Sequence, residues 1–402
     1  MALAQRHGAV REALFHAAHD PADQAKRGEL TRLLGELDPA GTVAEAGASG
    51  LMSALGDSTA MAMYWQEPDE EDRLLTDPGI AEALRPLARA IGGAPWTDWW
   101  SEAVALHDQA YVQWMEQGRD KDRPPPTRGA GQALRKWKAA AVEDERRAQS
   151  LPEDPTAAYS GCWWSLPSDA GITVTSRALP RLGAVQLMAV EDGAGWTRAR
   201  VWPVRASDDS RIYEVTGPQA WTELVERYPL PVPRSRRHDW WRATGRAAEW
   251  YIPDWAAVAD DFDAVHLTVL GYLATAGRAL DLRLPGNTGE PSATVLAGGD
   301  PDTTYWLTDS TAVGRHGAST DWVLRDPMTL TTATETTTAA ATATATATPT
   351  ATATPTAMRI RSGSLSPRRK ADGAAGLTAP ARSGQAAQAL QAGPRTARLA
   401  GA

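Results

Sequence analysis

The residues best suited to chemistry in this 402-residue chain lie late in the sequence, in the segment DAVHLTV. His266 and Thr268 are two positions apart, so a strand over 264–269 would place both side chains on one face. An imidazole beside a hydroxyl is a pair that can position or exchange a proton. The alternative is a buried structural histidine that is paired by a carboxylate such as Asp263 or Asp302. The sequence leaves both interpretations open.

An acidic segment, Asp300-Pro-Asp302, begins the D-x-D-x-T pattern of haloacid-dehalogenase-type phosphatases. In those enzymes the first aspartate is a nucleophile, and an apolar strand directly precedes it. Here Gly298 and Gly299 stand at that place. We therefore interpret the segment as a turn that leads into a strand.

The densest group of basic and aromatic residues is RSRRHDWWR, residues 234–242. Arg234 and Arg237 could contact phosphate, and the neighbouring indoles could stack on bases. The chain carries 41 basic and 49 acidic residues, however, and its formal charge of −8 would repel a long polyanion. A structural role or a small phosphate-bearing ligand is therefore favoured over a long nucleic acid.

Several function classes are disfavoured by what the sequence lacks. It has no P-loop, no dinucleotide-binding glycine motif, no nucleophile elbow and no H-E-x-x-H metal motif. The single cysteine, Cys162, excludes a disulfide framework and a multi-cysteine metal site. His16 and His19 are one helical turn apart, but such a pair near a terminus is usually an ordinary surface feature, so we predict no metal. We expect a cytoplasmic protein, since there is no long apolar segment and the first residues are too charged for a signal peptide.

Composition divides the chain into three regions. Residues 1–150 read mostly as helix, with leucines at 30, 33, 34 and 37 on one helical face, although 59–65 could be a buried strand. Residues 156–326 are rich in short β-forming segments with few helices between them, which favours a mixed or antiparallel sheet. Residues 327–402 are a Thr/Ala/Pro-rich tail that we predict to be disordered. The predicted class is therefore α+β. The main predicted strands are 172–176, 185–190, 197–201, 211–215, 264–269, 280–284, 294–297 and 304–307.

Four motifs carry a resemblance to known sequences. They are WWSLP at 163–167, SRRHDW at 235–240, PDWAAVA at 253–259 followed by DAVHLT, and GGDPDTTYWL at 298–307. With these motifs, residues 55–325 resemble a family of uncharacterised actinobacterial proteins, many of them from streptomycetes. The resemblance implies no activity. Gly299 stands where that family would have a tryptophan.

The order of three groups is also similar to that in ADP-ribosyltransferases: WWS at 163–165, HLT at 266–268 with a later tyrosine, and a late acid. This resemblance implies a small mixed-sheet fold that holds NAD, although the acid would be aspartate instead of the usual glutamate. Its implied catalytic residues are His266, Thr268 and Asp302. Its implied ligand contacts are Arg177, Arg234, Arg237, Trp163, Trp164 and Tyr272.

Two hypotheses about function follow. The first is an α+β domain that binds a small molecule or a protein partner without catalysis. The second is an NAD-consuming transferase, for which NAD would be the cofactor. A ligand cannot be named from the sequence alone.

Overall fold

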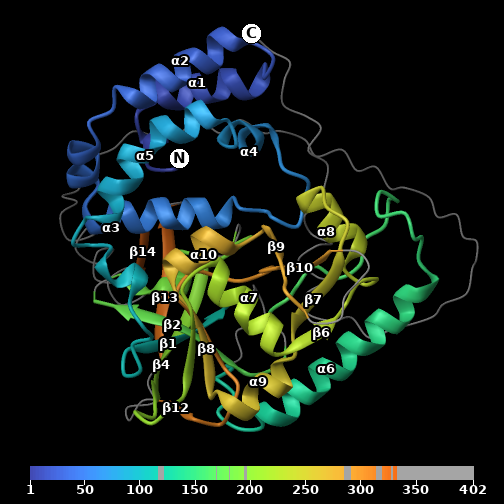
Figure 1. Ribbon diagram of the computed structural model, residues 1–402. Helices are drawn as coiled ribbons and strands as arrows, with labels where there is room; N and C mark the ends of the chain where they lie inside the picture. The colour runs from blue at the N-terminus through green and yellow to red at the C-terminus, as the bar shows by residue number, and fades with distance from the viewer. Residues whose placement is uncertain are drawn as a thin grey trace, which may run out of the picture. The chain divides into compact units, whose positions relative to one another are not determined.

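The computed structural model describes residues 1–115, 122–168, 170–180, 182–193, 197–284, 291–313, 319–326 and 329–332. The chain divides into two units, Met1–Glu335 and Thr336–Ala402, and everything described below belongs to the first. Helices come first along the chain and the strands of two sheets follow, so the predicted α+β class is confirmed (Figure 1). The tail predicted over 327–402 lies outside the described residues, apart from a strand at Thr329–Thr332.

The first part of the chain is helical and has an apolar core of its own. The predicted leucine face is confirmed, because Leu30 and Leu34 are buried on the second helix. The Asp23 carboxylate begins that helix by accepting hydrogen bonds from the backbone N–H groups of Ala25 and Lys26. The elements are η1 (Ala4–Arg6), α1 (Gly8–His19), α2 (Gln24–Gly35), α3 (Pro39–Ala60), α4 (Glu70–Leu75), α5 (Pro78–Gly92) and η2 (Asp98–Ser101).

The strand predicted over 59–65 is wrong. Thr59 and Ala60 complete α3, where the Thr59 hydroxyl donates to the Leu55 carbonyl, and turns follow from Met61. A short apolar segment at the end of a buried helix cannot be distinguished from a buried strand by its pattern alone.

The larger sheet carries the candidate site. Its strands lie in the order β14-β13-β4-β1-β2-β11-β8-β5, and every neighbouring pair is antiparallel except the parallel pair β8 and β5. Two short strands join from the side, β12 on β4 and β3 on β2. The bounds are β1 (Gln109–Trp114), β2 (Thr173–Leu179), β3 (Gly183–Ala184), β4 (Arg198–Ala206), β5 (Ile212–Val215), β8 (Ala264–Leu267), β11 (Thr303–Trp306), β12 (Thr311–Val313), β13 (Thr320–Asp326) and β14 (Thr329–Thr332).

Strand β1 lies between β4 and β2, although the sequence predicts a mostly helical region over 1–150. It pairs along its whole length with β4, from Gln109 opposite Val204 to Trp114 opposite Ala199. Because its partners are far along the chain, no local pattern indicates this strand. The sheet therefore includes residues from the region predicted to be helical.

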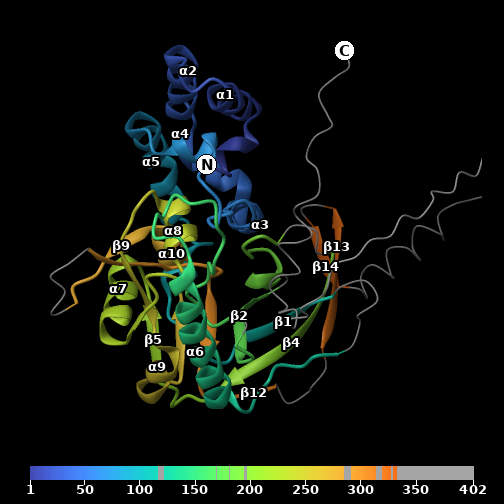
Figure 2. The same ribbon diagram turned by 90° about the vertical axis from the view of Figure 1, so that its right-hand side faces the viewer.

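A smaller sheet and five helices complete the described part of the chain. This sheet has the order β6-β7-β10-β9, with β7 and β10 parallel. Both views show α6 running beside α9 (Figures 1 and 2). The bounds are β6 (Pro229–Pro231), β7 (Glu249–Pro253), β9 (Ala279–Asp281), β10 (Ser292–Val295), α6 (Ala130–Arg147), α7 (Pro218–Arg227), α8 (Arg237–Thr244), α9 (Trp255–Asp261) and α10 (Val269–Thr275).

Tryptophan fills much of the core, as a chain with 17 Trp and only two Phe requires. Trp221 and Trp255 are fully buried, with ring centroids 6.4 Å apart. Their indole N–H groups donate to the Thr294 hydroxyl at 3.2 Å and to the Ser165 carbonyl at 2.9 Å. These indoles thus combine a large apolar surface with a satisfied polar atom.

The strand predicted over 185–190 is also wrong. Val185–Leu187 forms the 3-10 turn η4, and the Gln186 N–H donates at 3.0 Å to the side-chain hydroxyl of Ser176 on β2 instead of to a backbone carbonyl of a neighbouring strand. Burial still alternates, because Val185, Leu187 and Ala189 face the core. The alternation that predicted a strand therefore reports burial and not sheet pairing.

Candidate functional site

One face of the larger sheet carries a row of polar side chains across four neighbouring strands. Glu214 on β5 is paired in register with His266 on β8, His266 with Thr304 on β11, and Thr304 with Thr175 on β2. Residues opposite one another in a sheet share a face. Arg177 lies two residues after Thr175 on β2 and so points to the same side.

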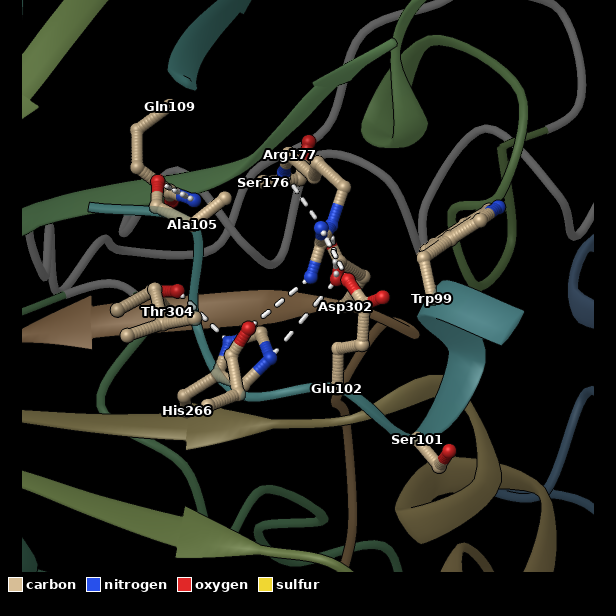
Figure 3. A network of polar contacts seen from close by, with 12 residues as sticks. Trp99, Ser101, Glu102, Ala105, Gln109, Ser176, Arg177, His266, Asp302 and Thr304 are labelled. Atoms are coloured by element: carbon tan, nitrogen blue, oxygen red, sulfur yellow. Dashed lines mark hydrogen bonds and ion pairs between the residues drawn. The ribbon is translucent and has the colours of Figure 1, made fainter. Parts of the chain in front are cut away.

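His266 lies at the centre of this row and is fully buried (Figure 3). Its Nδ1 lies 2.9 Å from the Thr304 hydroxyl, with which it forms a hydrogen bond. Its Nε2 lies 3.8 Å from Asp302 Oδ1 and 4.0 Å from Glu214 Oε2. Both His266 Nε2 and Glu214 Oε2 are buried and make no hydrogen bond to another described group. These distances are too long for direct hydrogen bonds, so three polar atoms converge without bonding one another.

Asp302 is held by Arg177 at the start of β11. Its Oδ2 accepts from the Arg177 backbone N–H at 2.7 Å, and its Oδ1 accepts from the guanidinium Nε at 3.5 Å. The other guanidinium nitrogens donate to Glu102 Oε2 and to the Ala103 carbonyl, both at 3.0 Å. Asp302 has a backbone φ of 55°, a left-handed conformation that aspartate and asparagine tolerate better than most residues. All three guanidinium nitrogens are thus engaged within the protein.

Burial is the main cause of the unusual acidities in this cluster. It lowers the pKa of His266 to about 3, with a smaller contribution from the Arg177 charge. It raises the pKa of Asp302 to about 6 against the opposing effect of Arg177, and the pKa of Glu214 to about 7. At neutral pH the imidazole is therefore uncharged, while the two carboxyl groups titrate in the range that general acid–base chemistry uses.

Thr268 does not share a face with His266, so this prediction is wrong. Strand β8 ends at Leu267, and Thr268 is the N-cap of α10, where its hydroxyl accepts from the Gly271 N–H at 2.9 Å. A Cβ at position 271 would overlap the Val215 carbonyl, so glycine lets the first turn of α10 approach β5 closely. Thr268 therefore stabilises a helix start.

A second buried acidic cluster lies on the other side of the Asp300-Pro-Asp302 turn. Asp300 accepts from the Glu191 N–H at 2.8 Å and from Gln186 Nε2 at 3.2 Å, while the Tyr272 hydroxyl donates to Glu191 Oε1 at 3.0 Å. Burial raises the pKa of Asp300 to about 6, and burial together with Asp300 raises the pKa of Glu191 well above its usual value. Of the residues predicted to contact a ligand, Tyr272 thus belongs to this cluster.

The remaining predicted residues make contacts around α8. The Trp163 carbonyl accepts from the Trp240 indole at 2.8 Å, and the Trp164 carbonyl accepts from a buried Arg236 at 2.9 Å. Arg237 donates to the Pro152 carbonyl at 2.8 Å. The backbone N–H of Arg234 donates to Glu145 at 3.0 Å. The structure therefore brings together His266, Asp302 and Arg177, and it gives these four residues other partners.

Reasoning from the sequence missed two members of the cluster, Glu214 and Glu102. Glu214 faces His266 only because β5 and β8 run parallel in a register that places 214 opposite 266. The available signal was a hydrophilic residue within the predicted strand 211–215. The sequence did not indicate which strand this one would pair with.

The structure also contains a groove between α6 and α9, with a cavity volume of about 600 Å³. It lies at Leu307–Asp309, beyond the end of β11 opposite to Asp302. The Asp309 carboxylate is used to accept from the N–H groups of Gly129 and Ala130, both at 3.0 Å, at the start of α6. The groove is thus distinct from the His266 cluster.

Within the described residues, no group of three or more His, Cys, Asp or Glu side chains is arranged to hold a metal ion. None of the helices in the same part of the chain combines the length and the apolar character needed to cross a bilayer.

Comparisons of the chain with protein-family models, with curated proteins and with solved structures find no match. The resemblances drawn from sequence motifs therefore stay predictions.

Proposed function

We propose that the protein binds a small molecule at the cluster of His266, Asp302 and Glu214, and that this ligand presents hydrogen-bond donors such as hydroxyl groups or a protonated amine. One observation supports the proposal above the others: His266 Nε2 and Glu214 Oε2 are buried without partners, and His266 Nε2 lies 4.0 Å from Glu214 Oε2 and 3.8 Å from Asp302 Oδ1. Buried polar atoms are normally paired, so unpaired ones that converge indicate a binding site.

The chemistry of the free atoms decides the class of ligand. Two carboxyl groups accept hydrogen bonds and attract positive charge, whereas the guanidinium of Arg177 is already bonded through all three nitrogens. A phosphate or a carboxylate would meet Asp302 and Glu214 without a free cation to hold it. This favours a donor ligand over NAD, whose phosphates are negatively charged and accept hydrogen bonds.

Binding with proton exchange fits this cluster better than nucleophilic catalysis. Thr304, His266 and Asp302 supply a hydroxyl, an imidazole and a carboxylate in sequence, as a catalytic triad does. The 3.8 Å gap between imidazole and carboxylate and the complete burial of Thr304 argue against an activated nucleophile. The carboxyl groups can still exchange a proton with a bound amine or hydroxyl near neutral pH. We place this function in the cytoplasm, since a chain with one cysteine, Cys162, has no disulfide framework of its own.

Thermal unfolding with small probes tests the proposal. Ethanolamine and glucose represent amine and hydroxyl donors, while inorganic phosphate and NAD represent anions, all at millimolar concentration and constant ionic strength. A ligand that binds only the folded state raises the melting temperature as its concentration rises. We expect this response with at least one of the two donor probes and with neither anion.

Two variants locate the response. Glu214→Gln removes the ionisable carboxyl from the cluster and should abolish the shift. Arg135→Ala removes a side chain from the groove between α6 and α9 and should leave the shift intact. A shift that survives in the Glu214 variant, or no shift with either donor, would refute the proposal. A shift with NAD alone would favour the transferase hypothesis instead.

A further inference from the structure

A short irregular segment, Glu102–Leu106, runs past the His266 cluster, and we name it the strap. It connects η2, which ends at Ser101, to β1, which begins at Gln109. Figure 3 shows this segment passing Glu102 and Ala105 beside Arg177, Asp302 and His266. Residues 102–106 belong to no helix or strand.

The strap is held by the same side chains that build the cluster. Arg177, which binds Asp302, donates to Glu102 Oε2 and to the Ala103 carbonyl. Glu214, whose Oε2 faces His266, accepts from the Val104 N–H through its Oε1 at 3.0 Å.

Each end of the strap is anchored more firmly than its middle. Trp100, just before it, is buried in an apolar cluster with Met52 and Leu55 of α3. At the other end, the buried Gln109 donates to the Ala105 carbonyl at 3.1 Å. The side chain of Glu102 is 56% exposed. Segments that are held by a few partly exposed polar contacts open locally more readily than those held by a sheet and an apolar core.

We propose that the strap is a gate, which opens as a unit between fixed ends to admit a ligand to His266. The class of ligand that the gate admits rests on the proposed function. The opening itself is a property of the protein without ligand. Opening breaks the bond between Val104 and Glu214, and it therefore frees the second oxygen of a carboxyl group that also faces His266. A ligand that donates a hydrogen bond to Glu214, and accepts none from the strap or from Arg177, would compete directly with the Val104 N–H.

Hydrogen exchange of the Val104 amide in the full chain measures this opening. The amide should exchange well before the amides of strand β8, which report global unfolding. Glu102→Gln removes one ion pair that holds the strap, and we expect it to speed Val104 exchange about threefold, the effect of losing a partly exposed pair. Glu29→Gln is the matched control, because Glu29 is an exposed residue paired with Arg32 on α2.

Modification of His266 by diethyl pyrocarbonate, followed by mass spectrometry, gives a second measurement. His266 is fully buried, so its reaction should follow strap opening and should accelerate in the Glu102 variant by the same factor as Val104 exchange. The melting temperature of both variants should stay close to that of the wild type.

The gate is refuted if Val104 and β8 amides exchange at one common rate, because the strap then moves only with unfolding. It is also refuted if the Glu102 and Glu29 variants behave alike. Failure of the proposed function looks different: the strap opens as expected, but neither ethanolamine nor glucose speeds Val104 exchange or raises the melting temperature.

Discussion

Replacing Asp302 with asparagine tests which group in the buried cluster holds a proton. Asparagine has nearly the same shape and tolerates the left-handed backbone at this position, so the substitution removes the charge with little other change. In the wild type, burial raises the pKa of Asp302 from 3.8 to about 6. The folded state therefore keeps a proton that the unfolded state has already released.

The sign and size of the effect follow from this difference. Below a pH of about 3.8 both states are protonated, and the group contributes no pH dependence. Between about pH 4 and pH 6 the wild type loses about 1.4 kcal/mol of stability for each unit of rising pH, about 3 kcal/mol in all. The asparagine variant lacks this loss. Its free energy of unfolding relative to wild type should thus rise by about 3 kcal/mol from pH 4 to pH 7.

His266 should show the opposite trend. Its pKa in the fold is about 3 against an ordinary value of 6.5, so the wild type loses stability as the pH falls below 6.5. His266→Asn should remove this loss, and the variant should gain relative to wild type as the pH falls. In the wild type the two titrations oppose each other over the same range, which hides both.

Urea unfolding followed by tryptophan fluorescence, repeated between about pH 4 and pH 7, provides the free energies of unfolding for all three proteins. Comparing differences between variant and wild type cancels the titrations that they share. If the free energy of unfolding of the Asp302 variant relative to wild type falls as the pH rises, the ion pair with Arg177 outweighs burial and the reasoning is wrong. A His266 pKa above 6 by NMR would contradict the second trend.

Three further substitutions test the local interpretation of other residues. Thr268→Ala should cost about 1 kcal/mol of stability, because α10 loses its N-cap. This variant should keep the response to probes at the cluster, and Thr268→Ser should keep the stability of the wild type. Gly271→Ala should cost about 3 kcal/mol by urea unfolding, because the new methyl group collides with the Val215 carbonyl, and unchanged stability would contradict the close packing. Joint replacement of Arg234 and Arg237 by alanine should leave the calorimetric response to probes unchanged, since their contacts are elsewhere.

Local patterns predicted the parts of the fold that local forces stabilise. The buried leucines of α2 recur with the helical period, so that helix could be identified from the chain alone. Strand β8 was recognised from its apolar residues, but it was predicted to continue to residue 269 and ends at Leu267. The segment that follows, Val269–Thr275, includes β-branched and aromatic residues that are also common in strands, and the bond from the Gly271 N–H to the Thr268 hydroxyl caps the start of a helix there.

The candidate site could be predicted only in part, because its geometry depends on contacts between distant segments. His266 and Asp302 were identified by their chemistry, and the pairing of β8 with β11 brings them together. Glu214 is separated from His266 by more of the chain than any periodicity can span, and it joins the site through a parallel strand pair. The strap could be predicted even less, since it belongs to residues 1–150, which were predicted to be mostly helical.

The acidic turn shows how one short motif serves two buried clusters. In an extended strand, residues 300 and 302 would point to the same side. The left-handed backbone of Asp302 breaks this alternation, so Asp302 accepts from the Arg177 amide while Asp300 accepts from the Glu191 amide. Each carboxyl group ties a different segment to the start of β11. The position of Asp302 beside His266 therefore depends on backbone conformation, and the segment is the turn before a strand that the sequence predicted.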